Sequence, residues 1–502
     1  MNTIRFILDG ELVEIEDIDP TRTVLQYLRE DIGRVGSKEG CAEGDCGACT
    51  VVVGELVDDR IRFRAVNACI QFMPTLDGKM LLTVESLRST EGQLHPVQQS
   101  MVDYHGSQCG FCTPGFIMSM FALYKTDADP DRKAIDDALS GNLCRCTGYR
   151  AIIEATRHMT DYAAPADANP IIFSPARENA KGASEQEKAM AKCLKKLRRK
   201  QGLRLEGGGR SYFAPASTDE LAEVYTQHPD ACILAGGTDV GLWVTKQLRE
   251  LPVVIYLGNV AQLNRIDETD DGIEIGAAVS LTDAFDSLSG QFPELAEMFR
   301  RFSSVPVRNA GTLVGNIANG SPIGDSMPAL ISLGARVKLR QGARNRELAL
   351  EALYIDYQKN AMQSREFVES VIIPKRDTAM KVRCYKLCKR FDQDISAVCA
   401  AFALQLHGDQ VASIDIVFGG MAAIPKRAAQ AEAVLSRNAW NEESVRQAMQ
   451  ALAKDFSPLT DMRASAAYRQ QSAANLLYRF YLETRTKDAL APEAVNVFAV
   501  QA

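Results

Sequence analysis

Cysteine is the residue type whose spacing in this sequence most directly indicates chemistry. Eight of the thirteen cysteines fall within the first 146 residues, in two sets of four. The first set has the spacing C-x4-C-x2-C with a fourth cysteine 20 positions on, and the second has C-x2-C followed by C-x-C. The two sets are Cys41, Cys46, Cys49 and Cys69, and then Cys109, Cys112, Cys144 and Cys146. Four thiolates per set is the number that one 2Fe-2S cluster requires, so the sequence predicts two clusters and a path for electrons.

Glycines interrupt the first set, whose spacing is the plant-type ferredoxin pattern. Gly44 and Gly47 alternate with its cysteines. A chain folded closely around a cluster needs positive φ angles and backbone N–H groups that reach sulfur, and glycine allows both. A zinc site or free core cysteines are the alternatives. Structural zinc commonly uses paired C-x2-4-C knuckles, which this triplet fits poorly.

The elements around the first set indicate a small sheet with one helix. The segment 4–8 alternates like a strand, Asp9-Gly10 is a two-residue hairpin signal, and the segment 12–15 returns. Asp19 and Pro20 suit the N-cap and first residue of a helix. Further strands are predicted over 50–53, 61–66 and 80–84. This order predicts a β-grasp, ferredoxin-like domain.

Helical segments surround the second set. Thr113 and Pro114 suit the N-cap and first residue of an apolar helix over 116–124. Two more helices are predicted, over 130–139 and 151–162. We therefore expect a small helical bundle around the second cluster. C-x-C alone is a weak signal, and it gains weight beside a ferredoxin-type set.

Two glycine- and hydroxyl-rich stretches follow residue 203, where neither a Rossmann G-x-G-x-x-G turn nor a G-x4-G-K-[ST] loop occurs. The first runs over 233–241, from a strand through Gly236-Gly237 into an apolar helix, and the second runs over 308–325. A glycine turn of this kind exposes successive N–H groups that can hold a pyrophosphate. Taken singly, each stretch is more often an ordinary turn.

Both cysteine blocks resemble the iron–sulfur segment of the molybdenum hydroxylases, the xanthine dehydrogenase and aldehyde oxidase family, and all eight ligand positions match. The glycine stretches resemble the FAD domain of that family, and the segment 385–396 resembles its block near the flavin and pyridine nucleotide. The resemblance places Gln108 close to the pterin of the molybdenum cofactor. The FAD contacts that it implies are Ile233, Leu234, Ala235, Gly236, Gly237, Thr238, Asp239, Val240, Gly241, Thr312, Gly315, Asn316, Ile317, Ser321 and Asp325. Phe391 and Asp394 are further candidates, with core packing and a helix cap as the alternative.

The resemblance also implies a division of labour between two chains. This sequence ends at Ala502, where the long single-chain members continue into molybdenum-binding domains, so we expect the iron–sulfur and FAD subunit of a two-chain enzyme, as in bacterial xanthine dehydrogenases. A large subunit with the molybdenum cofactor, in a dimer of heterodimers, would oxidise hypoxanthine and xanthine to urate. Electrons would then pass through both clusters to FAD and on to NAD+. No residue of this chain is expected to act on the purine.

Two alternatives to that function stay open. One is the same subunit in a hydroxylase that acts on aldehydes or N-heterocycles. The other is a non-catalytic iron–sulfur scaffold, against which the glycine stretches weigh.

Composition and length set the remaining expectations. With 502 residues, 46% apolar and 24% charged, several domains are expected, and the net charge of −7 argues against a nucleic-acid partner. No secretory signal or long apolar run is visible, which favours the cytoplasm and no membrane span. In that compartment clustered cysteines serve as ligands rather than disulfides. Four later cysteines in apolar runs are expected to be core thiols: Cys232, Cys384, Cys388 and Cys399.

The predicted fold class is α+β, with several domains. A linker with a short basic helix, expected to present a solvated face, separates the cluster domains from the flavin domains. The predicted parts are a 2Fe-2S ferredoxin-like domain (1–88), a helical 2Fe-2S domain (89–163), the linker (164–200), a FAD-binding domain (201–365) and a C-terminal flavoprotein domain (366–502).

Overall fold

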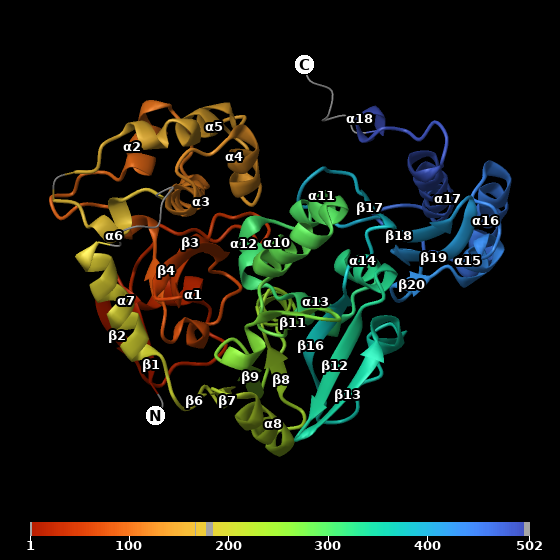
Figure 1. The fold of residues 1–502 in the computed structure, drawn as a ribbon. Helices are drawn as coiled ribbons and strands as arrows, with labels where there is room; N and C mark the ends of the chain where they lie inside the picture. Colours follow the sequence, from red (N-terminus) through yellow and green to blue (C-terminus); the bar gives the residue numbers. More distant parts are fainter. Residues whose placement is uncertain (1–2, 166, 177–183, 496–502) are drawn as a thin grey trace. The chain divides into compact units, whose positions relative to one another are not determined.

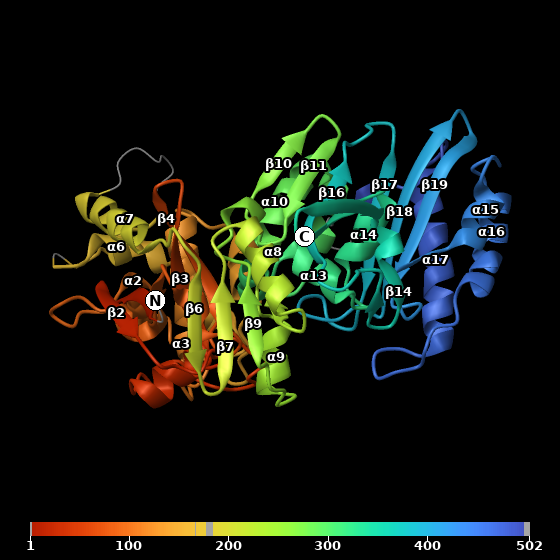
Figure 2. The same cartoon turned by 90° about the horizontal axis from the view of Figure 1, so that it is seen from below.

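The computed structural model describes residues 3–165, 167–176 and 184–495, and it divides into two compact units (Figures 1 and 2). The first unit comprises residues 1–262, 280–282 and 303–311. The second comprises residues 263–279, 283–302 and 312–502. Both cysteine sets and the first glycine stretch belong to the first unit. Most of the second glycine stretch belongs to the second unit.

The first unit begins with a five-stranded mixed sheet in the order β2-β1-β5-β3-β4. Asp9 and Gly10 have φ angles of 56° and 86°, which confirms the predicted hairpin turn between β1 and β2. The predicted strands of this domain are confirmed. Their bounds are β1 (Ile4–Leu8), β2 (Glu11–Ile15), β3 (Thr50–Val57), β4 (Arg60–Asn67) and β5 (Met80–Leu82).

The helix of this domain begins later than Asp19 and Pro20 predicted. Thr23 is its N-cap, and the Thr23 and Gln26 side chains satisfy each other's backbone N–H groups in a capping box ahead of α1 (Val24–Gln26). The chain continues as a π-helical turn, Tyr27–Asp31. Asp19 instead accepts the backbone N–H of Thr21 at 2.8 Å, so its carboxylate closes a local turn.

A helical domain follows, as predicted, with one helix that the sequence analysis missed, α2. The apolar helix α3 is buried from Gly115 to Tyr124. Its N-cap is Cys112, one residue before the predicted Thr113, and no side chain caps it. The helices are α2 (Pro96–Asp103), α3 (Thr113–Thr126), α4 (Arg132–Leu139) and α5 (Arg150–Arg157).

The predicted basic helix of the linker is confirmed as α7 (Glu185–Leu197), which follows the short helix α6 (Pro170–Phe173). The expectation of a solvated basic face is wrong for Arg199. Its buried guanidinium pairs with both carboxylate oxygens of Asp77, at 2.6 and 2.9 Å. Such bidentate pairs are strong and directional, so Arg199 fastens the linker to the ferredoxin-like domain. Residues 166 and 177–183 of the predicted linker lie outside the described residues.

A four-stranded sheet in the order β6-β7-β9-β8 completes the first unit. Its Leu203, Tyr212 and Tyr256 share one apolar core with the ferredoxin-like sheet. The helix α12 packs on β4 of that domain. The elements are β6 (Leu203–Gly207), β7 (Arg210–Ala214), α8 (Thr218–Gln227), β8 (Cys232–Leu234), α9 (Val240–Thr245), β9 (Val253–Tyr256) and α12 (Val305–Ala310).

The second unit contains a five-stranded sheet in the order β10-β11-β16-β12-β13. Its middle strand β16 is the segment that the sequence placed at the start of the C-terminal domain. That strand pairs with both β11 and β12, so it belongs to the flavin-side sheet. The elements are β10 (Ile266–Thr269), β11 (Gly272–Gly276), α10 (Leu281–Gln291), α11 (Ala296–Arg300), α13 (Leu313–Asn319), α14 (Ser326–Ser332), β12 (Arg336–Gln341), β13 (Arg344–Ala349) and β16 (Phe367–Pro374).

An antiparallel sheet in the order β17-β18-β19-β20 and three helices form the C-terminal part, with a continuous apolar core. From the sequence, strands are predicted here over 397–406 and 414–418, and helices over 427–435, 442–454 and 464–484. The structure confirms all five within a few residues. The elements are β17 (Lys381–Leu387), β18 (Val398–His407), β19 (Gln410–Gly419), β20 (Lys426–Arg427), α15 (Ala429–Leu435), α16 (Glu442–Asp455) and α17 (Ala466–Thr484). A small hairpin, β14 (Tyr354–Asp356) with β15 (Lys359–Asn360), and a last helix, α18 (Pro492–Val495), complete the unit.

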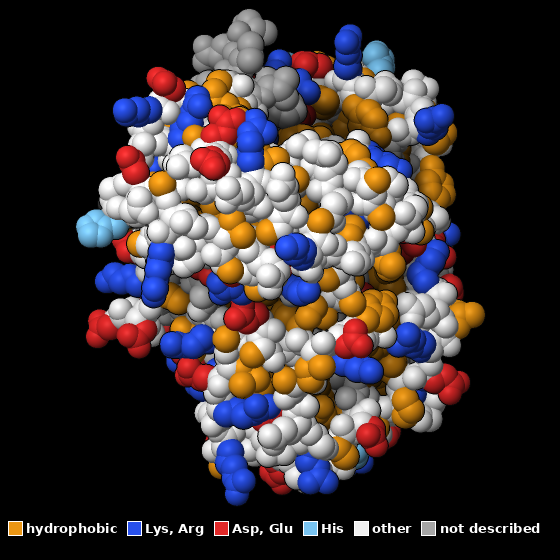
Figure 3. All heavy atoms as spheres, turned by 90° about the vertical axis from the view of Figure 1, so that its right-hand side faces the viewer, with side chains coloured by type: hydrophobic (Ala, Val, Ile, Leu, Met, Phe, Trp, Pro, Cys, Tyr) orange, Lys and Arg blue, Asp and Glu red, His pale blue; other side chains and the backbone are white. Residues whose placement is uncertain are grey.

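Two further observations concern the distribution of charge on the surface and the length and apolar character of the helices. On the face drawn in Figure 3, Lys and Arg side chains intermingle with Asp and Glu rather than gathering into a basic stripe. Among the described helices, none is both long and apolar enough to cross a bilayer.

Candidate iron–sulfur and flavin sites

The fold brings the four cysteines of the first set together. Cys41, Cys46 and Cys49 lie on the glycine-rich loop before β3, and Cys69 lies in the turn after β4. The mutual hydrogen bonding of the thiols lowers the pKa of Cys41, through Cys46 and then Cys69, and lowers that of Cys49 through Cys69. Cys49 and Cys69 are both only 2% exposed. Four adjacent sulfurs, two of them buried, form a pocket suited to a cluster.

Backbone N–H groups already face one sulfur of this set. The N–H groups of Glu43 and Cys46 each donate to Cys41 Sγ at 3.4 Å. The wrapping is tight: a Cβ added to Gly40 would lie 2.9 Å from Cys46 Sγ. Donors directed at sulfur stabilise the negative charge of an iron–sulfur cluster, so the loop fits that group.

The second set also assembles, at the N-terminal end of α3 and in the loop before α5. Hydrogen bonding to Cys109 raises the pKa of Cys146, while burial and the neighbouring Cys144 raise that of Cys112 to about 12. The Cys144 sulfur accepts N–H groups from Cys146 and Thr147, at 3.4 and 3.5 Å. Cys109 and Cys146 are exposed, so this set lies at the surface of the first unit.

The thiol contacts differ between the two sets. In the first set they form a chain, in which Cys41 contacts Cys46 and Cys69, and Cys69 contacts Cys49. In the second set they form two pairs, Cys109 with Cys146 and Cys112 with Cys144. These contacts bring four thiols together in each set, and the ligand spacing carries the distinction between a two-iron cluster and zinc.

A hydrogen-bonded seam links the two sets within the first unit. The N–H of Leu143, next to Cys144, donates to the carbonyl oxygen of Cys46 at 3.0 Å. The buried Asn142 donates to Gly47 O at 3.0 Å and accepts from Ser119 Oγ at 2.6 Å. A side chain on Gly47 would collide with this seam, because its Cβ would lie 2.1 Å from Gly141 O. Asn142 was not predicted from the sequence as a contact between the two sets. Its position two residues before Cys144 was the available signal.

The first glycine stretch also lies in the first unit. Ile233 and Leu234 end β8, the segment 235–239 turns, and Val240 and Gly241 begin α9. Gly237 has a φ angle of +76°. A Cβ on Gly236 would lie 2.0 Å from Ala310 O, so only glycine permits the close approach of this turn to the end of α12.

This stretch packs directly against the first cysteine set. Gln71, two residues after Cys69, donates from Nε2 to Gly236 O at 3.1 Å. A Cβ on Gly241 would lie 2.6 Å from Ile70 O. Farther along, Thr245 Oγ1 donates to Ala42 O at 2.7 Å. The predicted phosphate turn and the predicted ferredoxin-type cluster are therefore neighbours.

The other predicted FAD residues lie in the second unit. Thr312 is the N-cap of α13 and its hydroxyl accepts the N–H of Gly315 at 3.0 Å, while Asn316 Oδ1 accepts Ser326 Oγ at 2.6 Å. Ile317 is buried in the same helix, and Ser321 closes the turn that follows it. Several of these polar groups thus have structural roles of their own.

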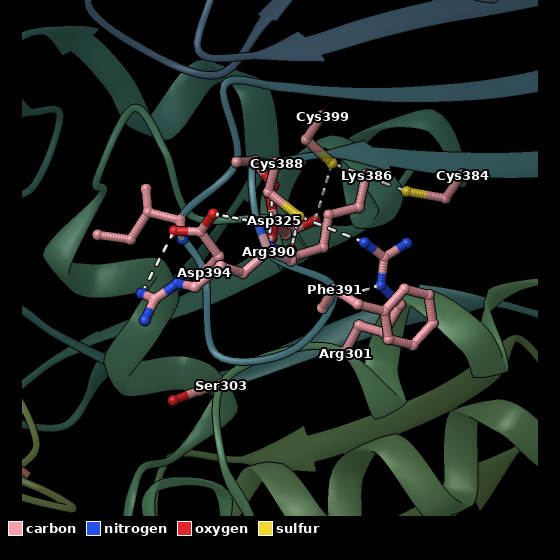
Figure 4. Close-up of polar contacts among 12 residues, drawn as sticks. Arg301, Ser303, Asp325, Cys384, Lys386, Cys388, Arg390, Phe391, Asp394 and Cys399 are labelled. Carbon is pink, nitrogen blue, oxygen red and sulfur yellow. Dashed lines mark hydrogen bonds and ion pairs between the residues drawn. The ribbon is translucent and has the colours of Figure 1, made fainter. Parts of the chain in front are cut away.

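Asp325 is the exception, and Figure 4 shows its surroundings. Its Oδ2 lies 2.5 Å from Lys386 Nζ, which also donates to Ser396 Oγ at 2.9 Å. Asp325 is 3% exposed, and its Oδ1 has no hydrogen-bond partner in the described part of the chain. A buried oxygen without a donor is costly, so this atom fits a hydroxyl from a bound group. Asp325 was predicted from the sequence as a site residue, whereas its pairing with Lys386 was not.

Phe391 and Asp394 follow β17 in a turn rather than a helix (Figure 4). The guanidinium of Arg301 stacks on the Phe391 ring, 4.2 Å from its centroid. The Asp394 carboxylate accepts the N–H groups of Lys389 and Arg390, each at 2.8 Å. Both side chains therefore have structural partners, and the cap that Asp394 provides is a turn cap, not the helix cap considered from sequence. Arg301 was not anticipated.

Gln108 and the four later cysteines complete the predicted set. Gln108 is exposed beside Cys109. Cys399 is buried as expected, with its Sγ 3.8 Å from Cys384 Sγ. Cys388 is not a core thiol: it is half-exposed and donates to Arg390 O at 2.9 Å. Cys232 is half-buried at the start of β8.

Four protein-family models match successive parts of the chain, which identifies an iron–sulfur flavoprotein. They are described as the 2Fe-2S iron-sulfur cluster binding domain (residues 6–73), the 2Fe-2S binding domain (83–157), the FAD binding domain in molybdopterin dehydrogenase (205–376) and the CO dehydrogenase flavoprotein C-terminal domain (383–484). The predicted fold class is confirmed.

Curated relatives and a solved structure narrow the identification. Xanthine dehydrogenase of Emericella nidulans is 32% identical over 97% of this chain, and xanthine dehydrogenase 1 of Arabidopsis thaliana is 30% identical over 99%. The chain spans only 39% and 40% of the length of these two relatives. Reconstituted CO dehydrogenase from Oligotropha carboxidovorans is 26% identical with a TM-score of 0.51, over 55% of this chain and 96% of that one.

The chain belongs to the molybdenum hydroxylase family, and it carries the 2Fe-2S and FAD domains through which that family transfers electrons. The curated relatives that match it are named xanthine dehydrogenases.

Proposed function

We propose that this chain is the electron-transfer subunit of a xanthine dehydrogenase. In this proposal a partner subunit with the molybdenum cofactor oxidises hypoxanthine and xanthine to urate. Electrons enter at the second cysteine set, pass to the first set, reach FAD and leave as a hydride to NAD+. The observation that carries the proposal is the unbroken order of contacts in the first unit, from Cys144 through Leu143 to Cys46, and from Cys69 through Gln71 to Gly236.

The entry point is assigned to the exposed end of this order. Cys109 and Cys146 are exposed, and three large apolar side chains near them in sequence are exposed too. These are Phe111 (46%), Leu143 (42%) and Tyr149 (38%). Exposed apolar groups around a redox centre suit a protein partner that covers them, because burying them releases water. We assign this surface, with Gln108, to the molybdenum-carrying chain.

The two glycine stretches are assigned to FAD. Within the first unit, the turn at Gly236 and Gly237 has bare backbone of the kind that can hold a pyrophosphate. Within the second unit, Asp325 has a buried acceptor oxygen that can receive a hydroxyl. When bound, a flavin converts single-electron transfer into hydride transfer, which iron–sulfur clusters cannot perform. Lys386 holds the Asp325 carboxylate in place by a buried ion pair. NAD+ as the acceptor rests on the similarity to the relatives alone.

The test is purification of the tagged chain from its native host, with iron, flavin and molybdenum measured in the eluate, followed by an assay of xanthine-dependent NADH formation. We expect four irons and one FAD per chain, a co-purifying molybdenum protein and NADH formation. Turnover of aldehydes or N-heterocycles in place of xanthine would support the electron-transfer role but change the proposed substrate of the partner subunit. Absence of flavin and of a molybdenum partner would overturn the proposal.

The flavin assignment has its own test in Asp325→Asn. Replacing the carboxylate weakens a charged hydrogen bond, which is worth ~1.5–3 kcal/mol, so FAD affinity should fall at least about tenfold. Glu366→Gln is the matched control, because Glu366 is another buried carboxylate of the second unit, paired with Arg346 at 2.7 Å. Flavin content after gel filtration is the measurement. Equal flavin retention in both variants would contradict the assignment.

A further inference from the structure

Asn67 is a buried asparagine whose side chain has no hydrogen-bond partner among the described residues. It is 1% exposed, and neither its Nδ2 nor its Oδ1 is bonded within the described part of the chain. An amide removed from water without partners costs ~1–3 kcal/mol for each unsatisfied group. Buried polar groups in folded proteins are nearly always satisfied, so this amide points to a group that the chain itself does not supply.

The backbone directs Asn67 toward the first cysteine set. It is the last residue of β4, where it pairs with Thr50, the residue after Cys49. The chain then turns tightly, because Ala68 N–H donates to Cys49 O at 3.3 Å and Ile70 N–H donates to Asn67 O at 3.2 Å. This turn carries Cys69. Asn67 therefore lies between two cysteines of the first set.

The Asn67 side chain also faces the first cysteine set. The Asn67 side chain lies beside the Cys49 side chain without a formed hydrogen bond between them. On the other side, a Cβ placed on Gly44 of the cysteine loop would lie 3.8 Å from Asn67 Oδ1. The amide is thus enclosed by the loop, the turn and the sulfurs.

We infer that Asn67 donates an Nδ2 hydrogen bond to a sulfur of the first 2Fe-2S cluster and thereby raises its reduction potential. The inference rests on the proposed function, since it requires the cluster. A reduced cluster carries one more negative charge than an oxidised one, so a donor at sulfur stabilises the reduced form more.

Another buried asparagine shows how different this arrangement is. Asn142, which is 3% exposed, has its amide fully used: Nδ2 donates to Gly47 O and Oδ1 accepts from Ser119. The Asn142 side chain therefore joins two segments of the same chain. Asn67 has equal burial and no protein partner, which is the pattern expected of a side chain reserved for a bound group.

The test is an EPR-monitored redox titration of the full chain with both clusters loaded, comparing wild type with Asn67→Leu and Asn67→Asp. Both variants remove the donor, and Asn67→Asp keeps the shape of the side chain in case Asn67→Leu does not fold. We expect the reduction potential of the first cluster to fall by ~59 mV, which corresponds to a tenfold change in the equilibrium constant of a one-electron reduction. The second cluster's potential should stay unchanged in the same samples.

Thr75→Val is the matched control. Thr75 is a buried hydroxyl of the same domain that donates to Phe72 O at 2.7 Å, so the variant perturbs packing without a donor near the cysteines. It should leave both potentials unchanged. An unaltered first-cluster potential in the Asn67 variants, or equal shifts of both clusters, would overturn the inference. Wild type without iron–sulfur signals would instead overturn the proposed function.

Discussion

The two cysteine sets have the same residue type in different surroundings. In the first set Cys49 and Cys69 are 2% exposed and belong to the apolar core that the ferredoxin-like sheet shares with the β6-β7-β9-β8 sheet. In the second set Cys109 and Cys146 are exposed, while Cys112 and Cys144 pack against the helical core. The first set therefore has two buried thiols, and the second set has two exposed thiols at the surface of the same unit.

This difference matches two different tasks in electron transfer. A surface cluster can approach the cofactor of another protein, whereas an interior cluster is shielded from water and depends on the hydrogen-bond donors that the protein provides. The seam through Leu143 and Asn142 connects the two sets by hydrogen bonds. Three predictions test whether the two cysteine sets differ in their surroundings and in their tasks as this comparison indicates.

The largest expected effect comes from replacing one ligand in each set. Cys49→Ser should abolish the first cluster's EPR signal and keep the second, and Cys112→Ser should do the reverse. Either variant should stop electron flow to FAD, because the two centres act in series. Only Cys49→Ser should also destabilise the domain strongly, since Cys49 lies in its apolar core. Retention of both signals in either variant would contradict the ligand assignment.

Acid should discriminate between the two cluster domains. His95 of the helical domain is fully buried, among Phe121, Tyr124 and Phe173, and burial lowers its pKa to about 3. The unfolded chain takes up this proton near pH 6.5 and the folded chain does not. The stability contributed by neutral His95 is therefore complete above pH 6.5 and falls, by up to ~1.4 kcal/mol per pH unit, down to about pH 3.

The measurement for this prediction is urea unfolding between pH 7 and 5, followed by hydrogen exchange in each domain. His95→Asn should flatten the pH dependence in the helical domain, since asparagine can still cap α2. His407→Asn, at an exposed site, should retain it. The ferredoxin-like domain should respond little, because residues 1–88 contain no histidine. An equal acid response in both domains would refute the prediction.

The smallest effect is expected at the seam. Asn142→Ala should cost ~1–3 kcal/mol of unfolding free energy, because it leaves Gly47 O and the Ser119 hydroxyl without their present partner. Thermal unfolding of the loaded protein is the measurement. Both clusters should remain, with slower transfer between them in single-turnover kinetics. Ser413→Ala, at an exposed hydroxyl of β19, serves as the control and should change neither. Unchanged stability in Asn142→Ala would show that the seam is not held by this residue.

Most elements were predictable because their signals are local. The Asp9-Gly10 hairpin, the apolar helix after Cys112 and the C-terminal helices follow from turn chemistry and periodicity. The start of α1 and the membership of β16 were not predictable in this way. The first depended on which of two possible caps forms a reciprocal pair, and the second on which distant strands lie beside the segment 367–374.

By itself, the sequence determined the cysteine sets, the order of the domains and the family that they resemble, since ligand spacing is written along the chain. Only the tertiary structure decided the rest. It buried two thiols of the first set and exposed two of the second, placed Gln71 against Gly236, and joined Lys386 to Asp325. It also left the buried Asn67 side chain without a hydrogen-bond partner in the part of the chain that the structure describes. These relations depend on contacts between residues far apart in the sequence, which no local pattern encodes.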